Sequence, residues 1–283
     1  METSDDALLS DRAVITPWEA VTLANNYMFN TVMTANPDLC RRFIEHLLHI
    51  RIDRIEQPQS EFSIAADAES RGVRFDVYVT DNGARRVFDL EMQVTNRRNL
   101  PERARYYQGI IDESSLKPSE NYTELRTSYI LFLCLFDPFG RGLPVYTFQN
   151  RCDELPSLLL HDRTYKVFYN TKAYTALQQG EERAIFQLLL DGTARSAFTS
   201  ELREKMEYAR KNAQYRQAYM TLARLRREER EEGEAYGERK KALEDAHNFL
   251  QLGIAAEVVA KGTGLPLEEV RALQAGGAAT PLA

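Results

Sequence analysis

The sequence predicts an α/β fold: a mixed sheet flanked by helices, followed by an α-helical C-terminal extension. Residues 74–93 alternate apolar and polar side chains on either side of Asn82-Gly83, which is typical of a β-hairpin. Residues 129–136 are nearly all apolar, as expected of a central strand covered on both faces. From about residue 181 onward the chain is helical in pattern and highly charged.

The elements around the hairpin follow from the same patterns. Helices are expected at residues 17–35 and 37–49, with Asn36 as N-cap and Pro37 at the first position of the second helix. The remaining elements are short strands at 52–56 and 61–65, a helix at 101–114, and strands at 145–149 and 164–169. This order is that of a sheet with helices packed on it.

The hairpin carries acids on one face: Asp76 on its first strand, and Asp89 and Glu91 on its second. A two-residue Asn-Gly turn pairs Asp76 with Asp89 and makes Glu91 the diagonal neighbour of Asp76. Diagonal Cβ atoms lie about 7–8 Å apart, so the two carboxylates can converge on one ion. Because strands use acids sparingly, this face favours a divalent-metal site. The simpler interpretation is a solvated face, and the segment alone does not decide.

The composition limits the classes of function. With 283 residues, 43% hydrophobic and 28% charged, the chain suits a globular protein with one main domain and a smaller one. A net charge of −6 disfavours a generally basic nucleic-acid binder, although local patches can still bind DNA. Cys40 and Cys134 have apolar neighbours, which indicates reduced core residues of a cytoplasmic protein. No apolar run is long enough for a membrane span, and no motif supports zinc binding, ATP hydrolysis or serine or cysteine catalysis.

Four regions are expected along the chain: an α/β domain at 1–180, a charged helical region or linker at 181–240, a small helical module at 241–275, and a disordered tail at 276–283. Residues 224–239 are either a solvated helix or a self-association helix, and Gly233 and Gly237 weaken any continuous coiled coil. The module has helix-turn-helix spacing around residues 262–264, with Pro266 opening the second helix. It is either a simple helix pair or a DNA-reading element.

The order of these motifs resembles the PD-(D/E)XK nuclease superfamily, with Asp76 on one strand, Glu91 and Gln93 on the next, and a helix containing residues 105–108. Residues 25–30 and 254–273 extend the resemblance over most of the chain, to the recombination-promoting nuclease and transposase family. The resemblance implies a restriction-endonuclease-like core that hydrolyses DNA phosphodiester bonds in recombination or transposition. It also implies that Asp76 and Glu91, helped by the Met92 carbonyl, hold Mg²⁺ or Mn²⁺.

Gln93 stands where the superfamily has a lysine. Glutamine cannot supply a positive charge or take a proton, so it can only orient water or a phosphate oxygen. The resemblance adds Gln108 to the catalytic residues Asp76, Glu91 and Gln93. Further candidates are Tyr107, for which a core position is equally open, Glu45 as an accessory acid, and four phosphate-binding arginines: Arg97, Arg98, Arg103 and Arg105.

Three hypotheses remain after this comparison. The first is a Mg²⁺-dependent DNA endonuclease, which rests on the acids in their sheet context. The second is a catalytically inactive protein of the same fold that binds DNA or a protein, and Gln93 motivates it. The third is an oligomeric scaffold in which the C-terminal helices assemble copies of the chain.

Overall fold

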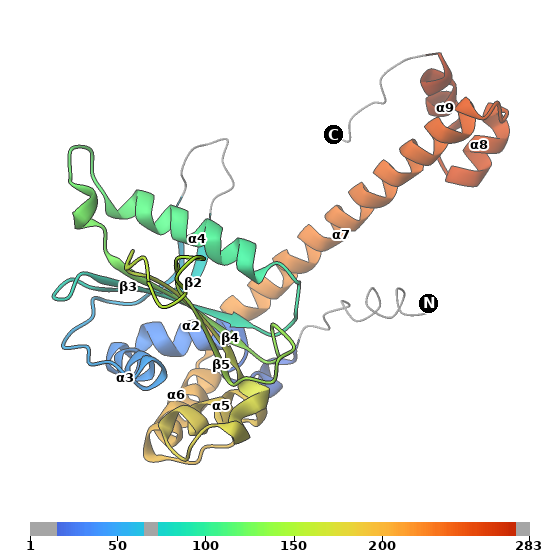
Figure 1. The fold of residues 1–283 in the computed structure, drawn as a ribbon. Coiled ribbons are helices and arrows are strands. Elements are labelled where there is room, and N and C mark those ends of the chain that lie inside the picture. Colours follow the sequence, from blue (N-terminus) through green and yellow to red (C-terminus); the bar gives the residue numbers. More distant parts are fainter. Residues whose placement is uncertain (1–15, 65–72, 276–283) are drawn as a thin grey trace. The chain divides into compact units, whose positions relative to one another are not determined.

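The computed structural model describes residues 16–64 and 73–275. The chain divides into two compact units, residues 1–216 and residues 217–283 (Figure 1). No helix in the described part of the chain combines the length and the apolar character that a membrane crossing requires.

Unit 1 is built on a mixed sheet. Its described strands follow the order β1-β2-β3-β4-β6-β5. Their bounds are β1 (Gln59–Ile64), β2 (Val73–Asp81), β3 (Arg86–Gln93), β4 (Thr127–Cys134), β5 (Val145–Phe148) and β6 (Thr164–Asn170). β4 pairs in parallel with β3 and β6, and the other pairs are antiparallel. Residues 130–134 of β4 are all buried, which confirms the predicted central strand.

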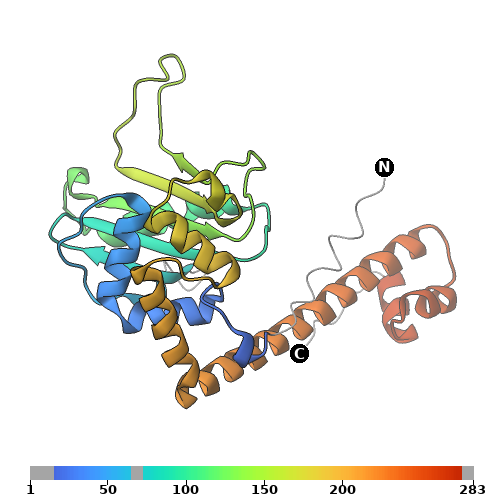
Figure 2. The same ribbon diagram turned by 90° about the horizontal axis from the view of Figure 1, so that it is seen from below.

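Helices cover both faces of this sheet (Figures 1 and 2). One face carries α4 (Leu100–Ser115), whose apolar side chains pack with Ile130 and Phe132 of β4. The other face carries α2 (Asn26–Ala35), α3 (Pro37–Leu48), α5 (Glu181–Asp191) and α6 (Ala197–Lys211). On that side the Tyr169 hydroxyl donates to the Leu47 carbonyl at 3.0 Å. The predicted α/β class is therefore confirmed.

The first predicted helix begins later than expected. Residues 18–20 form a short 3₁₀ turn, and α2 begins at Asn26. The reason is Asn25, whose side chain accepts the backbone N–H groups of Tyr27 at 3.0 Å and Met28 at 3.3 Å. An Asn in that role starts a helix and leaves the preceding residues outside it. α3 begins at Pro37 as predicted, although Asn36 makes no side-chain cap bond.

The strand predicted at residues 52–56 does not form. Side chains of α3 bind the backbone at its start instead, since the Ile52 N–H donates to Glu45 at 2.8 Å and Arg41 donates to the Ile52 carbonyl at 3.3 Å. At its end the Glu56 N–H donates to the Thr80 carbonyl of β2 at 2.9 Å. The following strand, predicted at 61–65, is β1, and its last predicted residue lies outside the described residues.

The β2–β3 hairpin forms, but its turn is longer than predicted. Asp81 pairs with Arg86, so the turn holds residues 82–85, and Arg85 takes the left-handed conformation at φ 52°. The predicted pairing of Asp76 with Asp89 is therefore wrong, because Asp89 lies opposite Tyr78. A shift of two residues keeps the predicted alternation along the paired residues 77–81 and 86–90. Phe75 departs from it, because it packs with Tyr78 and with Tyr107 of α4, on the face that was predicted for Asp76 and Tyr78.

Asp81 explains the longer turn. Its carboxylate accepts the Ala84 N–H at 3.2 Å and binds the Arg86 guanidinium at 2.6 Å and 2.9 Å. Asp81 is almost fully buried, so these bonds hold the hairpin closed where a two-residue Asn-Gly turn was expected.

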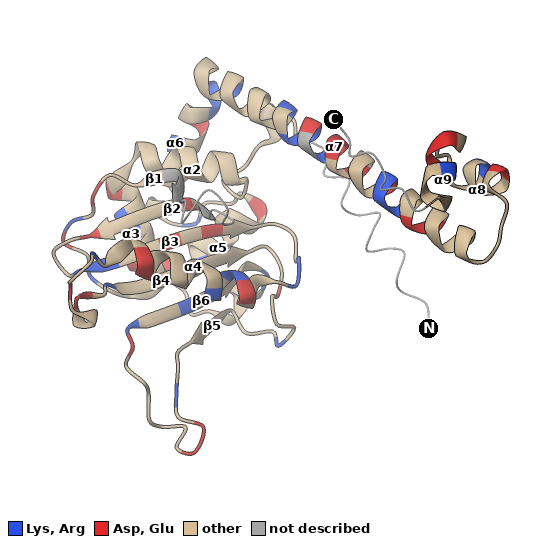
Figure 3. Cartoon of the chain, turned by 90° about the horizontal axis from the view of Figure 1, so that it is seen from above, with Lys and Arg blue, Asp and Glu red and all other residues tan. Residues whose placement is uncertain are grey.

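Unit 2 contains most of α7 (Ala213–Gln251), together with α8 (Ala256–Thr263) and α9 (Leu267–Gln274). Side chains of both charges are distributed along α7 (Figure 3), and the helix continues unbroken through Gly233 and Gly237. The two short helices form where predicted: Gly264 ends α8 at φ 74°, and Pro266 precedes α9. Residues 276–283, expected to be disordered, lie outside the described residues.

Replacing Asp81 tests the closure of the hairpin. We expect Asp81→Asn to lower the free energy of unfolding by about 2 kcal/mol, because the partly buried Arg86 guanidinium loses its charged partner. Urea unfolding followed by circular dichroism measures the change. The exposed Asp53 provides the control, and Asp53→Asn should stay within about 0.5 kcal/mol of the unsubstituted protein. Equal losses in both variants would contradict this account.

Candidate active site

β2 and β3 separate close to two of the predicted acids. Their ladder ends at the pair Val77–Leu90. Beyond that pair β2 continues beside β1, and β3 continues beside β4. Asp76 and Glu91 are the next residues on their strands. They therefore lie where β2 and β3 begin to separate, which is the start of the strand opening.

Across this opening each carboxylate accepts a hydrogen bond from the backbone of the other strand. The N–H of Asp76 donates to Oε1 of Glu91 at 3.0 Å, and the N–H of Met92 donates to Oδ2 of Asp76 at 3.0 Å. The side chains thus satisfy backbone groups that separating strands leave without ladder partners. Main-chain atoms therefore fix the positions of both carboxylates.

Asn26 adds a further bond from α2. Its Nδ2 donates to Oδ2 of Asp76 at 3.0 Å. Residues 25–30 are part of the family resemblance, but the sequence pattern assigns no role to Asn26. One signal could have indicated it: Asn25 and Asn26 are adjacent, and only one of them is needed to cap the helix.

Arg103, in the first turn of α4, brings a guanidinium to the other oxygen of Glu91. Its Nη2 lies 2.9 Å from Oε2 of Glu91 and donates to the Tyr107 hydroxyl at 2.9 Å. Its Nη1 donates to Oε1 of Gln93 at 2.9 Å. The guanidinium carbon also lies 5.3 Å and 5.6 Å from the ring centroids of Tyr107 and Phe132. The predicted phosphate-binding arginine is thus part of the acidic cluster.

Gln93 lies between Arg103 and Glu91 and is buried. Because a guanidinium only donates, Gln93 must accept through its oxygen, which turns the amide nitrogen toward Glu91. That nitrogen lies 3.5 Å from Oε2 of Glu91. Arg103 therefore joins the predicted residues Glu91, Gln93 and Tyr107 in one cluster, and Asp76 is joined to it through Glu91.

Asp89 is fully buried, and neither of its carboxylate oxygens has a hydrogen-bond partner in the described part of the chain. Burial raises the pKa of Asp89 well above its ordinary value, and the nearby Asp76 carboxylate raises it further. Burial also raises the pKa of Glu91, and the charges of Asp89 and Asp76 add to this rise. The burial of Asp89 and Glu91 excludes the solvated-face interpretation.

The charge of this cluster would favour a hard divalent cation. Three carboxyl groups, from Asp76, Asp89 and Glu91, share the positive charge of Arg103, so negative charge is in excess when they ionise. Among the described residues, no three His, Cys, Asp or Glu side chains gather at one point that suits a metal ion. Asp76 and Glu91 are the residues that could hold such an ion, and water would supply the remaining ligands, as Mg²⁺ prefers.

Gln108 and Glu45 have other partners. Gln108 is buried, accepts the Ser128 hydroxyl at 2.9 Å and donates to Asp112 at 2.9 Å. Glu45 binds Arg41 at 2.8 Å and accepts the Ile52 N–H at 2.8 Å. The structure therefore places these two predicted residues in networks of their own, and any role at the site stays a prediction.

The three other predicted arginines are exposed. Arg97 and Arg98 lie in the turn between β3 and α4, a few residues after Gln93. Arg105 lies on α4. Arg97 and Arg98 are therefore accessible to a polyanion, and Arg105 is exposed on α4 two residues after Arg103.

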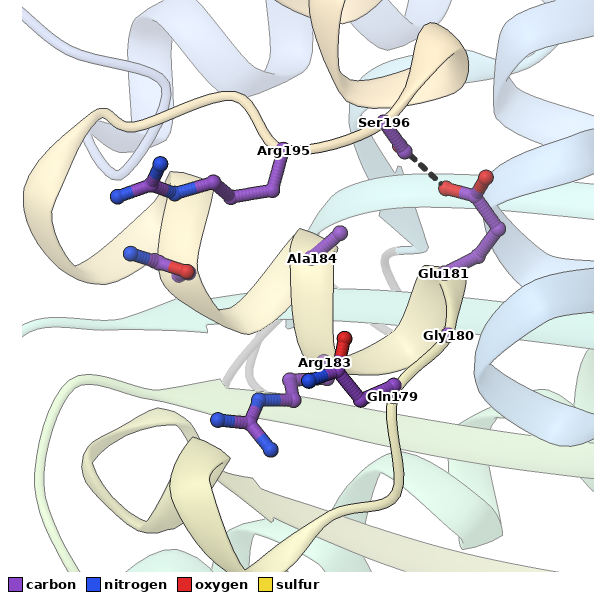
Figure 4. A pocket seen from close by; sticks show the side chains of 8 residues that line it. Gln179, Gly180, Glu181, Arg183, Ala184, Arg195 and Ser196 are labelled. Carbon is purple, nitrogen blue, oxygen red and sulfur yellow. Dashed lines mark hydrogen bonds between the residues drawn. The ribbon is translucent and has the colours of Figure 1, made fainter.

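A separate cavity of about 480 Å³ lies beside α5 (Figure 4). Arg183 and Arg195 line it, and the Glu181 carboxylate at its rim accepts the Ser196 hydroxyl at 2.5 Å. The cavity is lined by none of the predicted site residues and holds no second acid. The cluster at the strand opening therefore remains the candidate site.

Residues 23–139 match the family model described as PD-(D/E)XK nuclease family transposase. The matched segment runs from just before α2 to just after β4 and contains the whole acidic cluster. It confirms the resemblance predicted from the motifs. Comparison with the curated proteins and with the solved structures gave no match.

The buried Asp89 gives a pH-dependent prediction. Between its ordinary pKa of about 3.9 and its raised pKa in the fold, the folded state holds a proton that the unfolded state has lost. The free energy of unfolding therefore falls as pH rises through this window, by up to about 1.4 kcal/mol per pH unit. We expect Asp89→Asn to make this slope shallower in urea unfolding at a series of pH values in EDTA.

The control for this measurement is Glu113→Gln, which removes an exposed carboxylate from α4. That variant should keep the slope of the unsubstituted protein. An Asp89→Asn slope equal to that of the control would show that Asp89 ionises normally in the fold.

Proposed function

We propose that the protein is a divalent-metal-dependent DNA endonuclease, and the match of residues 23–139 to the PD-(D/E)XK nuclease family transposase model supports this proposal. The family supports a nuclease or transposase-related role, and its nucleases typically use divalent metal ions. The observation that carries the proposal is the pair of carboxylates, Asp76 and Glu91, held by main-chain N–H groups at the strand opening.

In this proposal Asp76 and Glu91 hold Mg²⁺ or Mn²⁺, with the Met92 carbonyl as an additional oxygen ligand. The bound ion supplies Lewis acidity, which polarises a phosphodiester and lowers the pKa of water. The chain supplies preorganisation, because the backbone N–H groups and Asn26 fix the carboxylates before any ligand arrives.

Gln93 and the exposed arginines have separate roles. The Gln93 amide nitrogen faces Glu91, so it orients a water molecule or a phosphate oxygen beside the acid pair. Arg97, Arg98 and Arg105 contact the DNA backbone on either side of the cleaved bond. The proposed reaction is hydrolysis of that bond, in recombination or transposition.

Nicking of supercoiled plasmid tests the function. We expect the full chain to nick plasmid in Mg²⁺ and to stop in EDTA. Asp76→Ala and Glu91→Ala should each lower the rate by about 10²–10³-fold or more, since each removes an anchor of the ion.

Glu113→Gln is the matched control for plasmid nicking, because it removes an exposed carboxylate on α4 that has no place in the proposed site. Its rate should equal that of the unsubstituted protein. Nicking that persists unchanged in both alanine variants would rule out the acid pair as the catalytic site.

The alternative is a catalytically inactive protein that binds DNA. Two observations favour it: Arg103 already occupies Oε2 of Glu91, and Gln93 carries no charge. Calorimetric titration with Mg²⁺ separates the two functions. An inactive protein would bind a labelled duplex without binding Mg²⁺ through Asp76 and Glu91.

The exposed arginines give a prediction for DNA affinity. We expect Arg97→Gln and Arg98→Gln to weaken binding of unrelated duplexes to the same degree, because phosphates carry no sequence information. Each substitution should also make the negative slope of log binding constant against log salt concentration shallower by about 0.9. Fluorescence anisotropy with a labelled duplex in Ca²⁺ measures both effects.

Arg203→Gln removes an exposed guanidinium from α6 and serves as the control for DNA affinity. It should leave both the affinity and the salt slope unchanged. If all three variants behave alike, the turn between β3 and α4 does not contact DNA.

A further inference from the structure

We propose that Arg103 is the fixed cation of the active site and that it acts together with Gln93 as one functional unit. This inference rests on the proposed nuclease function. Gln93 stands where the superfamily has a lysine, but it is uncharged. The guanidinium of Arg103 lies beside Gln93, and it comes from α4 rather than from β3.

The hydrogen bonds join the two side chains into a unit. Arg103 donates to the Gln93 oxygen at 2.9 Å, which holds the amide with its nitrogen toward Glu91. Without Arg103 the amide would be free to turn over, since its two ends are nearly equal in shape. Arg103 therefore determines which end of Gln93 faces the acid pair.

The surroundings of Arg103 keep its charge in place. It binds Glu91, donates to the Tyr107 hydroxyl, and packs near the rings of Tyr107 and Phe132. An arginine held on several sides loses little conformational entropy when a ligand arrives. Such a charge is preorganised for the negative charge that develops on a phosphodiester during hydrolysis.

Arg103 also has donors to spare. A guanidinium carries five N–H groups. Three of them donate to described side chains, those of Glu91, Gln93 and Tyr107. The remaining donors can reach a phosphate oxygen while these bonds persist.

The proximity of the two residues permits a test by exchange of charge. Arg103→Gln removes the cation, Gln93→Lys adds one on β3, and the double variant Gln93→Lys/Arg103→Gln moves the cation from the helix to the strand. The readouts are the single-turnover nicking rate of supercoiled plasmid in Mg²⁺, the Mn²⁺ affinity by calorimetry without DNA, and the melting temperature.

We expect Arg103→Gln to nick about 10²–10³-fold more slowly, as for the loss of one preorganised electrostatic group. The same variant should bind Mn²⁺ more tightly, because the guanidinium no longer competes for Oε2 of Glu91. The double variant should recover to within about tenfold of the original rate. Gln93→Lys alone should bring no gain, since two cations then compete for one carboxylate. Arg203→Gln is the control and should leave the nicking rate unchanged.

The outcomes separate this inference from the proposed function. Absence of nicking by the unsubstituted chain would overturn the nuclease function itself. Nicking by the unsubstituted chain, with an equal rate in Arg103→Gln, would overturn only the role of Arg103. A folded double variant that is as slow as Arg103→Gln would overturn it as well.

The role of Arg103 can still be tested if one of these variants fails to fold. If Arg103→Gln does not fold, the double variant decides by its rate. If neither folds, Arg103→Lys decides, because it keeps the charge on α4. Arg103→Lys should retain more than about a tenth of the original rate, and a folded but inactive Arg103→Lys would contradict a role based on charge.

Discussion

The exchange of backbone hydrogen bonds between Asp76 and Glu91 is the constraint on which the rest of the site depends. Each carboxylate takes an N–H from the opposite strand at the point where the β2–β3 ladder ends. The strands can therefore separate without leaving these backbone donors unpaired. The same two bonds place a pair of acids at the opening, where Arg103 from α4 and Asn26 from α2 reach them.

The fold was predictable where a local pattern determines it. Alternation with a period of two identified β2 and β3, and the apolar run identified β4 as the central strand. The alternation did not assign every face, because Phe75 packs beside Tyr78 and Tyr107. The register was not predicted, because the Asn-Gly signal was weighed without the side chain of Asp81. Likewise, Asn25 shortened the first helix through bonds that hydrophobic periodicity does not record.

The site was predictable only for the residues that the strands themselves carry. Asp76, Glu91 and Gln93 follow from spacing along neighbouring strands. Asn26 reaches Asp76 from 50 residues away, and no local pattern indicates such a contact. Arg103 was recognised by its charge, but its place beside Glu91 depends on how α4 packs on the sheet. The burial of Asp89 has the same tertiary origin, since α4 covers that face.

The contact between Gln93 and Arg103 also has an evolutionary consequence. Moving the positive charge from α4 to β3 requires two substitutions, because the cation must be removed at residue 103 and added at residue 93. In the proposed arrangement, one intermediate would carry two adjacent cations and the other none, so each single step would be unfavourable although both end states place one cation beside Glu91. Selection on such a pair shows sign epistasis, and a lineage that carries Gln93 with Arg103 would be held in that state.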